Sequence, residues 1–498
     1  GYARTAISLL AGLADAKGDD RMAEDRFKDA IRRTEKMRGG LGSAEFSMAF
    51  LADKLDAYQG LASLYLRQGR LEEAFVLTEN SRSRSLLDSM GSDRALSGAT
   101  TEMENRIVDL RTELNWLYKQ MDDAPDESKL QSEIRLRERK IAEITTRIGS
   151  LAEKRDRKSP AFDVHTLQRQ LGNERTLIEY VERGGRISAF VVTGVKLSYV
   201  ADLCTVAEVA AGLNDLQFQF GACRFGIERL GRFVDELKRR ADQCLQRLFK
   251  MLVHPIEELL VGSEVIFVPC GQLSHVPFPA LFDGEQYMVE RLTVDHAPGA
   301  AIWLTLCERT YDPPTNALLV GFADERIPLV EREIDSLKEH FLSSKVLLGS
   351  AASFAAFSNE APEFDLIHMA CHGQFRGDNP MFSSLHLSDG WVTARDISSH
   401  KLKARIVTLS ACETGLSQVY AGDETLGLVR GFLIAGASSL IVSLWTVNDK
   451  TAAPLMSDMY SELQLGATPA ASLQKAQINF IKRGEHPYLW APFVAIGR

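Results

Sequence analysis

One thiol and one imidazole in the second half of the chain each follow a short apolar run. Cys412 follows Ile-Val-Thr-Leu-Ser-Ala at 406–411, and His372 follows Leu-Ile-His-Met-Ala-Cys at 366–371. Because a thiol at its ordinary pKa is mostly protonated at neutral pH, a catalytic cysteine needs a neighbouring base. An imidazole can take the thiol proton and later give it to a leaving amine. The two residues therefore have the chemistry of a nucleophile and its general base.

The sequence around both residues predicts buried parallel strands, because each apolar run stops shortly before a glycine. Forty residues separate His372 from Cys412, enough for one strand, a crossover and the next parallel strand. The carboxyl ends of neighbouring parallel strands meet at one edge of a sheet, where ligands and chemistry collect. We therefore expect His372 and Cys412 to lie side by side at that edge.

His368 is the alternative general base. Alternate residues of a strand share one face, so the side chains at 368 and 372 point the same way. We favour His372 because it lies at the strand end, beside Gly373, where the chain opens to substrate. We expect His368 to be a hydrogen-bonded core histidine or to support the site from behind.

The motifs at these strand ends are similar to those of a protease family. His372-Gly373, followed by Ser-Ala-Cys-Glu-Thr-Gly at 410–415, resembles the CHAT protease family, a branch of the caspase, gingipain and separase clan. The order of His before Cys also resembles the caspase pattern and excludes a papain-like one, in which Cys comes first. The resemblance extends from about Leu177 to Arg498. Further matches in family order lie at 266–281, 421–424, 442–449 and 489–493.

This resemblance implies an α/β caspase-like fold, with a mostly parallel sheet flanked by helices. By resemblance to separase-like enzymes, residues 161–315 would form a pseudo-protease half and residues 316–498 the active half. The residues themselves predict a β-hairpin over 176–192, turned at Gly184-Gly185, and a helical segment over 206–260. Apolar runs predict further buried strands at 265–268, 317–322 and 439–444.

Several residues near the strand ends are candidates for contact with the substrate. The backbone N–H groups of Gly373 and Cys412 would form the oxyanion hole, although Gly373 is also explained by turn geometry alone. Asp423 and Glu424 follow the nucleophile, and clan members that cleave after Arg or Lys bind that side chain on a carboxylate. Asp423 is explained equally well as a helix N-cap.

Trp445 and Asp449 follow the third strand of the expected active half, where they would line the substrate groove. Packing in the core is the alternative for Trp445. His275 matches a further position of the family pattern, and we expect it to be structural because no nucleophile accompanies it.

A zinc site built from His368, Cys371, His372 and Cys412 is disfavoured. Such ligands need helical or knuckle spacing, whereas these residues occupy strand-like sequence and lack the glutamate of an HExxH motif. Glycine-rich phosphate loops and a serine nucleophile elbow are absent from the sequence. We therefore expect neither a metal nor a cofactor.

Residues 1–92 contain a helical repeat. Leu10, Ala11, Ala14, Gly18, Ala23, Phe27 and Ala30 occupy the same offsets as Leu61, Ala62, Tyr65, Gly69, Ala74, Thr78 and Ser81. Small residues let two helices pack closely and glycine turns the chain between them, a pattern that resembles the tetratricopeptide repeat. The units start further apart than the usual period, so we expect an extended or interrupted helix near residues 39–42. The repeats are either a helical cap or a peptide-binding sensor, and we favour the sensor in the intact protein.

Residues 93–160 predict a helical hairpin. Apolar residues recur three and four apart on both sides of a break at 122–126, which is typical of a coiled-coil seam. The hairpin is interpreted as a spacer in preference to a dimerisation arm or a lever.

The composition is that of a globular protein. The 498 residues are 45% hydrophobic and 25% charged, and the formal net charge of −9 disfavours direct nucleic-acid binding. No apolar run is long enough to span a membrane, and no export signal opens the sequence. Seven irregularly spaced cysteines disfavour a disulfide framework, so we expect a reducing cytoplasmic location. The chain begins in helical periodicity and is interpreted as a fragment or a processed product.

Together these patterns predict a cysteine endopeptidase that is inactive until a protein partner acts on the helical N-terminal region. By family analogy the substrate would be a gasdermin-like pore former or a CRISPR-associated protein, which implies a role in bacterial defence. The alternatives are a non-catalytic scaffold for protein–protein interaction and an enzyme that cleaves only itself.

Overall fold

The computed structural model describes most of the chain as two compact units, Gly1–Val164 and His165–Arg498. The described residues are 7, 10–15, 17–38, 56–90, 101–121, 127–151, 162–223, 227, 231, 233–309, 312–323, 329–376, 379–410, 424–445, 447 and 449–498. Among them, no helix is long and apolar enough to cross a membrane.

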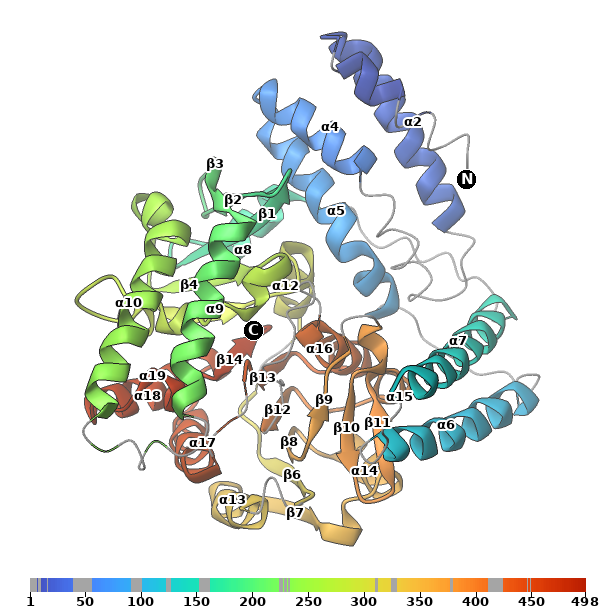
Figure 1. Cartoon of the computed structure of the whole chain (residues 1–498), viewed down its shortest axis with the longest axis vertical. Coiled ribbons are helices and arrows are strands. Elements are labelled where there is room, and N and C mark those ends of the chain that lie inside the picture. Colours follow the sequence, from blue (N-terminus) through green and yellow to red (C-terminus); the bar gives the residue numbers. More distant parts are fainter. Residues whose placement is uncertain are drawn as a thin grey trace. The chain divides into compact units, whose positions relative to one another are not determined.

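The first unit contains the predicted helical repeat. Its helices include α2 (Asp20–Arg38), α4 (Asp56–Arg67) and α5 (Leu71–Met90), shown in blue in Figure 1. Gly18 and Gly69 have φ values of 76° and 75°, a left-handed conformation that glycine adopts without steric cost. The predicted glycine turn before the second helix of each unit is therefore confirmed. The expected irregularity at residues 39–42 lies outside the described residues.

Small residues let the repeat helices pack closely. The buried alanines of the pattern include Ala11, Ala23, Ala62 and Ala74, whereas Leu10, placed in the same pattern, is 45% exposed. Gly60 of α4 lies against the ring of Phe27, close enough that a Cβ at residue 60 would come within 2.5 Å of the ring Cζ. The packing of α4 on α2 thus requires glycine at this point.

The predicted helical hairpin consists of α6 (Thr101–Met121) and α7 (Glu127–Leu151). Its buried side chains include Leu110 and Leu114 of α6 and Ile134 and Ile141 of α7. Arg137 of α7 also donates a 3.1 Å hydrogen bond to the carboxylate of Glu113. The two helices therefore pack through an apolar seam, and the predicted break at 122–126 lies outside the described residues.

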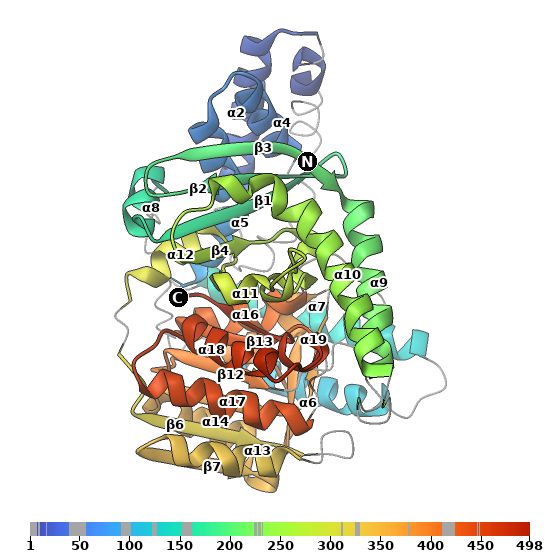
Figure 2. The same cartoon turned by 90° about the vertical axis from the view of Figure 1, so that its left-hand side faces the viewer.

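Eleven of the described strands of the second unit form one sheet, in the order β3-β2-β1-β4-β5-β14-β13-β12-β8-β6-β7 (Figure 2). Their bounds are β1 Arg175–Arg183, β2 Arg186–Val192, β3 Leu197–Thr205, β4 Glu264–Val268, β5 Thr293–His296, β6 Asn316–Gly321, β7 Ser343–Leu348, β8 Leu366–Ala370, β12 Ile406–Ser410, β13 Ser439–Ser443 and β14 Phe493–Ile496. Strands β7, β6, β8, β12 and β13 run parallel. β6, β8, β12 and β13 were expected from their apolar sequences, whereas β7 is half polar and was not.

A single strand joins the two halves of this sheet. β14 runs antiparallel to β13 and meets β5 at the pair Ile496 and His296. In the first half, β1 and β2 form the predicted hairpin, with φ values of 55° at Gly184 and 74° at Gly185. The division into a pseudo-protease half and an active half stays a prediction.

Helices cover both faces of the sheet. Their bounds are α8 Val164–Leu171, α9 Val206–Cys223, α10 Val234–Leu252, α11 Met288–Arg291, α12 Ala300–Cys307, α13 Val330–Leu337, α14 Phe354–Glu360, α15 Ala394–Ser398, α16 Glu424–Ala435, α17 Asp449–Gln464, α18 Pro469–Lys482 and α19 Pro487–Trp490. In the second half, α13, α17 and α18 lie on one face, and α14, α15 and α16 lie on the other (Figure 1). The helical segment predicted over 206–260 consists of three described elements, namely α9, α10 and the 3-10 helix His254–Leu259.

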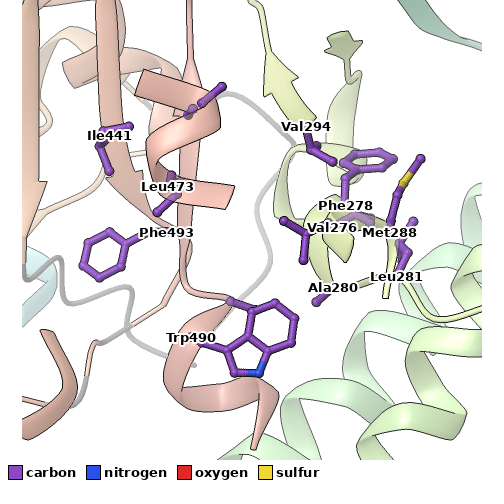
Figure 3. Close-up of a cluster of buried hydrophobic side chains, with 14 of the residues drawn as sticks. Val276, Phe278, Ala280, Leu281, Met288, Val294, Ile441, Leu473, Trp490 and Phe493 are labelled. Carbon is purple, nitrogen blue, oxygen red and sulfur yellow. The ribbon is translucent and has the colours of Figure 1, made fainter. Parts of the chain in front are cut away.

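The apolar core is continuous across the two halves. Figure 3 shows Trp490 between Phe493 and Leu473 on one side and Phe278 and Ala280 on the other. Trp490 is fully buried. The halves therefore share packing as well as the sheet.

A small second sheet follows β8. It has the order β11-β10-β9, with β9 at Gly373–Gln374, β10 at Ser384–Leu387 and β11 at Gly390–Thr393. This sheet begins one residue after His372, so it extends the chain directly from the candidate site.

Candidate active site

The strands that lead to His372 and Cys412 are direct neighbours in the sheet. β8 and β12 pair in parallel, with His368 opposite Thr408 and Ala370 opposite Ser410. Every residue of both strands is buried, as their apolar sequence predicts. The predicted adjacency of these two strands is therefore confirmed.

His372 lies two residues beyond the end of β8. Its side chain is buried, with an exposed fraction of 6%. Its carbonyl accepts a 2.8 Å hydrogen bond from the N–H of His386 in β10. Gly373 starts β9 and pairs with Leu385 of β10. The small sheet thus fixes the backbone on both sides of the His372–Gly373 peptide bond.

Four other candidate residues have no described side chain. Cys412 and Asp423 lie outside the described residues. Glu424 and Asp449 are the first residues of α16 and α17, and their side chains are not described. The pairing of Cys412 with His372 and the contacts of these carboxylates with substrate therefore stay predictions.

His368 is the centre of a buried hydrogen-bonded network. Its Nδ1 lies 2.8 Å from the hydroxyl of Tyr460 in α17, and its Nε2 lies 3.2 Å from Oε1 of Glu333 in α13. The Tyr460 hydroxyl also donates a 2.8 Å hydrogen bond to the hydroxyl of Thr408. Both ring nitrogens of His368 thus have partners, which confirms that it is a hydrogen-bonded core histidine.

Burial controls the protonation of Tyr460. Desolvation raises the pKa of its hydroxyl far above the usual value, because the phenolate would be uncompensated in the interior. Tyr460 therefore keeps its proton and remains a hydrogen-bond donor.

Trp445 is held by packing contacts. Its indole N–H donates a 3.1 Å hydrogen bond to the carbonyl of Tyr488. Its ring centroid lies 4.9 Å from that of Phe220 and 6.5 Å from that of Tyr488. These contacts favour the packing interpretation, and a role in the substrate groove stays a prediction.

Four other thiols of the second unit are poor nucleophiles. Burial raises the pKa of Cys204, Cys223 and Cys307 to about 11, and it also raises the pKa of Cys244. A thiol with such a pKa carries almost no thiolate at neutral pH. Reactivity at neutral pH is therefore not expected from these four residues.

A cysteine–histidine contact joins Cys223 of α9 to His486. Sγ lies 3.9 Å from Nε2, while Nδ1 accepts a 3.1 Å hydrogen bond from the N–H of Tyr488. Burial lowers the pKa of His486 to about 4, so the ring is neutral and its single proton is on Nε2. Nε2 then has no lone pair for a thiol proton, and this pair is not a catalytic dyad.

The described residues provide no metal site. They contain no group of three or more His, Cys, Asp or Glu side chains placed to hold an ion. The two nitrogens of His368 are already hydrogen-bonded, which removes one ligand of the disfavoured zinc set.

His275 ends the 3-10 helix Gly271–His275, and burial lowers its pKa.

Comparisons with known proteins agree with the motifs at these strand ends. Residues 242–498 match the CHAT domain family. The tetratricopeptide repeat protein 28 of Mus musculus is 26% identical over 323 residues, and that of Homo sapiens is 26% identical over 324 residues. Each match covers 51% of this chain but only 13% of the relative.

The fold also resembles a solved structure. The separase–securin complex of Saccharomyces cerevisiae matches with a TM-score of 0.53 at 11% identity, covering 96% of this chain and 37% of that chain. At this identity the likeness shows the fold alone. The α/β caspase-like fold expected from the sequence is therefore confirmed.

Proposed function

The chain belongs to the CHAT domain family, and from this premise we propose that it is a cysteine endopeptidase. Cys412 is the nucleophile and His372 is the general base. The fold is that of a cysteine protease-like protein, and the family match covers both residues.

The proposed reaction proceeds through an acyl-enzyme. His372 takes the proton of the Cys412 thiol, and the thiolate attacks the scissile carbonyl carbon of the substrate. The N–H groups of Gly373 and Cys412 stabilise the oxyanion, and His372 then gives its proton to the leaving amine. Water attacks the thioester with His372 again as base, which releases the second product and restores the thiol.

One observation carries the proposal, namely the register of β8 and β12. Ala370 and Ser410 are direct partners in parallel strands, and the sequence places His372 and Cys412 each two residues later. Parallel strands present their carboxyl ends at the same edge. Because His372 and Cys412 each lie two residues beyond this paired position, we expect their side chains to lie close together. The raised pKa of Cys204, Cys223, Cys244 and Cys307 disfavours those four thiols as the nucleophile.

We also propose a protein partner that controls the activity. The intact protein would remain inactive until a partner binds the helical repeats or the helical hairpin, whose two helices are proposed to form a coiled coil. The substrate would be a gasdermin-like pore former or a CRISPR-associated protein in a cytoplasmic defence system. The separase of similar fold is in complex with securin, a precedent for a protein partner.

The alternative function is a scaffold without catalysis. The curated relatives are named for their repeats, which is the observation that favours it. In a scaffold, replacement of Cys412 would change neither partner binding nor any covalent product. An enzyme that cleaves only itself would instead give fragments of this chain alone.

The test compares new protein N-termini after purified protein is incubated in a lysate of the cells from which the chain comes, because that lysate also supplies the proposed activating partner. The variants are Cys412→Ala, His372→Ala and the matched control Cys244→Ala, which removes a thiol from α10. We expect new N-termini with wild type and the control, and none with the other two. Products that persist with Cys412→Ala would refute the proposal, and products confined to this chain would indicate self-processing.

A further inference from the structure

Tyr460 connects the two strands that lead to the proposed catalytic residues. Its hydroxyl is hydrogen-bonded to His368 of β8 and to Thr408 of β12, each at 2.8 Å. His368 and Thr408 are direct partners in the parallel pairing. One hydroxyl group therefore joins two side chains at the same level of two neighbouring strands.

This level has a fixed relation to the proposed dyad. His372 follows His368 by four residues, and Cys412 follows Thr408 by four residues. The side chains of His368 and Thr408 lie on the face covered by α13 and α17, because His368 contacts Glu333 and Tyr460 of these helices and Thr408 contacts Tyr460. A shift of one strand along the other would change the relative level of both strand ends.

Burying the polar side chains of this network costs folding free energy unless each has a hydrogen-bond partner. Glu333, His368 and Thr408 are buried, with exposed fractions of 5%, 0% and 0%. An apolar side chain at these positions would avoid the cost of burying polar groups. Tyr460 also packs edge-on against Phe341, with centroids 5.3 Å apart, so its ring is fixed independently of its hydroxyl.

We propose that Tyr460 is a positioning residue for the dyad, a role that rests on the proposed function. Its hydroxyl holds His368 and Thr408 at one level, and this sets the separation of the His372 imidazole from the Cys412 thiol. Glu333 completes the network by fixing the orientation of the His368 ring from α13. Proton transfer needs hydrogen-bond distance, and displacements near 1 Å are known to reduce rates strongly.

The test measures the alkylation rate of Cys412 by iodoacetamide at pH 7.5, followed by mass spectrometry of the peptide that contains it. This rate reports thiolate formation and requires no knowledge of the substrate. Tyr460→Phe removes one hydroxyl and keeps the ring. Tyr180→Phe is the matched control, because Tyr180 is fully buried and its hydroxyl donates a 3.0 Å hydrogen bond to the carbonyl of Leu252 in the first half.

We expect Tyr460→Phe to reduce the alkylation rate by about tenfold or more, and Tyr180→Phe to leave it within about twofold, with similar thermal unfolding of both variants. In a His372→Ala background, Tyr460→Phe should have no further effect, because the dyad is already absent. Thr408→Val should lower the alkylation rate as Tyr460→Phe does. Thr408→Ser, which keeps the hydroxyl, should retain the wild-type rate.

The outcomes separate the two proposals. If His372→Ala leaves the wild-type alkylation rate unchanged, the dyad itself is wrong. If His372→Ala lowers the rate but Tyr460→Phe does not, only the positioning role is wrong. The role is also refuted if Tyr460→Phe lowers the rate equally with and without His372, since a general loss of structure would do the same.

Discussion

The carboxylate of Glu333 in α13 lies 3.2 Å from Nε2 of His368 in β8, and both side chains are buried. The contact joins a helix to the central strand of the second half. Because a buried polar atom without a partner loses its hydration and gains nothing in return, each member of this pair depends on the other.

We predict that Glu333→Ala destabilises the second unit by about 1–3 kcal/mol, the usual cost of a buried hydrogen-bonding group left without a partner. Glu333→Gln should cost less, because its side-chain amide has both a donor and an acceptor and can still form a hydrogen bond with Nε2. Urea unfolding of both variants measures the difference. Equal losses for Ala and Gln would show that the hydrogen bond contributes little.

Glu333 also shows what the sequence could not predict. The apolar face of its helix carries Val330, Ile334 and Leu337, which recur at helical spacing and are all buried. Glu333 lies on that same face, where a carboxylate is unusual. This was a signal of a buried partner, but the partner is on a strand thirty-five residues later, and helical periodicity carries no information about it.

The strands were predictable because their signal is local. β8, β12 and β13 are short continuous apolar runs, the pattern of strands buried on both faces. Their adjacency followed from the short connections between them. The role of Tyr460 was not predictable, because a tyrosine among apolar helix residues has the same pattern whether or not its hydroxyl has a partner. The single sheet shared by both halves depends on β14, whose pairing with β5 joins residues 200 positions apart.

Gly60 provides a prediction for the repeat unit. Gly60→Ala adds a Cβ within 2.5 Å of the Phe27 ring, and Phe27 is itself buried. Overpacking of this kind costs about 1–3 kcal/mol, which exceeds the gain of about 1 kcal/mol from helix propensity. Thermal unfolding followed by circular dichroism should therefore show a lower melting temperature for this variant.

The matched control is Gly12→Ala. Gly12 is helical and exposed, and nothing lies within 4 Å of a Cβ at this position. Only the gain in helix propensity applies at this position, so we expect this variant to be more stable than the wild type. If both alanines stabilise the protein, the close approach of α4 to Phe27 is absent in solution.

His296 predicts a loss of stability in acid. Burial lowers its pKa to about 4, while the unfolded value is near 6.5. As the pH falls from about 6.5 to about 4, the unfolded chain binds a proton that the folded protein does not, so the free energy of unfolding decreases over this range. The full contribution is on the order of 3 kcal/mol for a shift of this size.

His296→Asn should flatten this pH dependence, because its amide N–H can still donate to the carbonyl of Ala495, which lies 3.1 Å from Nδ1. His254→Gln, at an exposed position, is the control and should keep the wild-type profile. Urea unfolding at pH 4.5 and 7.5 measures both. An unchanged profile for His296→Asn would mean that other groups cause the acid sensitivity.

Gly427 links the packing of α16 to the proposed activity. A Cβ at residue 427 would lie 1.9 Å from the carbonyl oxygen of Pro380 and 2.9 Å from Oγ of Ser383. The nearest atom belongs to the backbone, so it cannot move aside as the end of a side chain can. Gly427→Ala must therefore displace α16, the helix that follows the Cys412 segment in the sequence.

We predict that Gly427→Ala lowers the free energy of unfolding by about 1–3 kcal/mol and also lowers the alkylation rate of Cys412. Gly221→Ala in α9 is the matched control, because nothing lies within 4 Å of a Cβ there, and it should be neutral or stabilising. If Gly427→Ala lowers stability alone and leaves the alkylation rate unchanged, then the position of α16 does not influence the thiol. If it lowers both while Gly221→Ala lowers neither, the close approach of α16 to Pro380 contributes to the reactivity of Cys412, because adding a methyl group to a helix elsewhere in the same unit has no such effect.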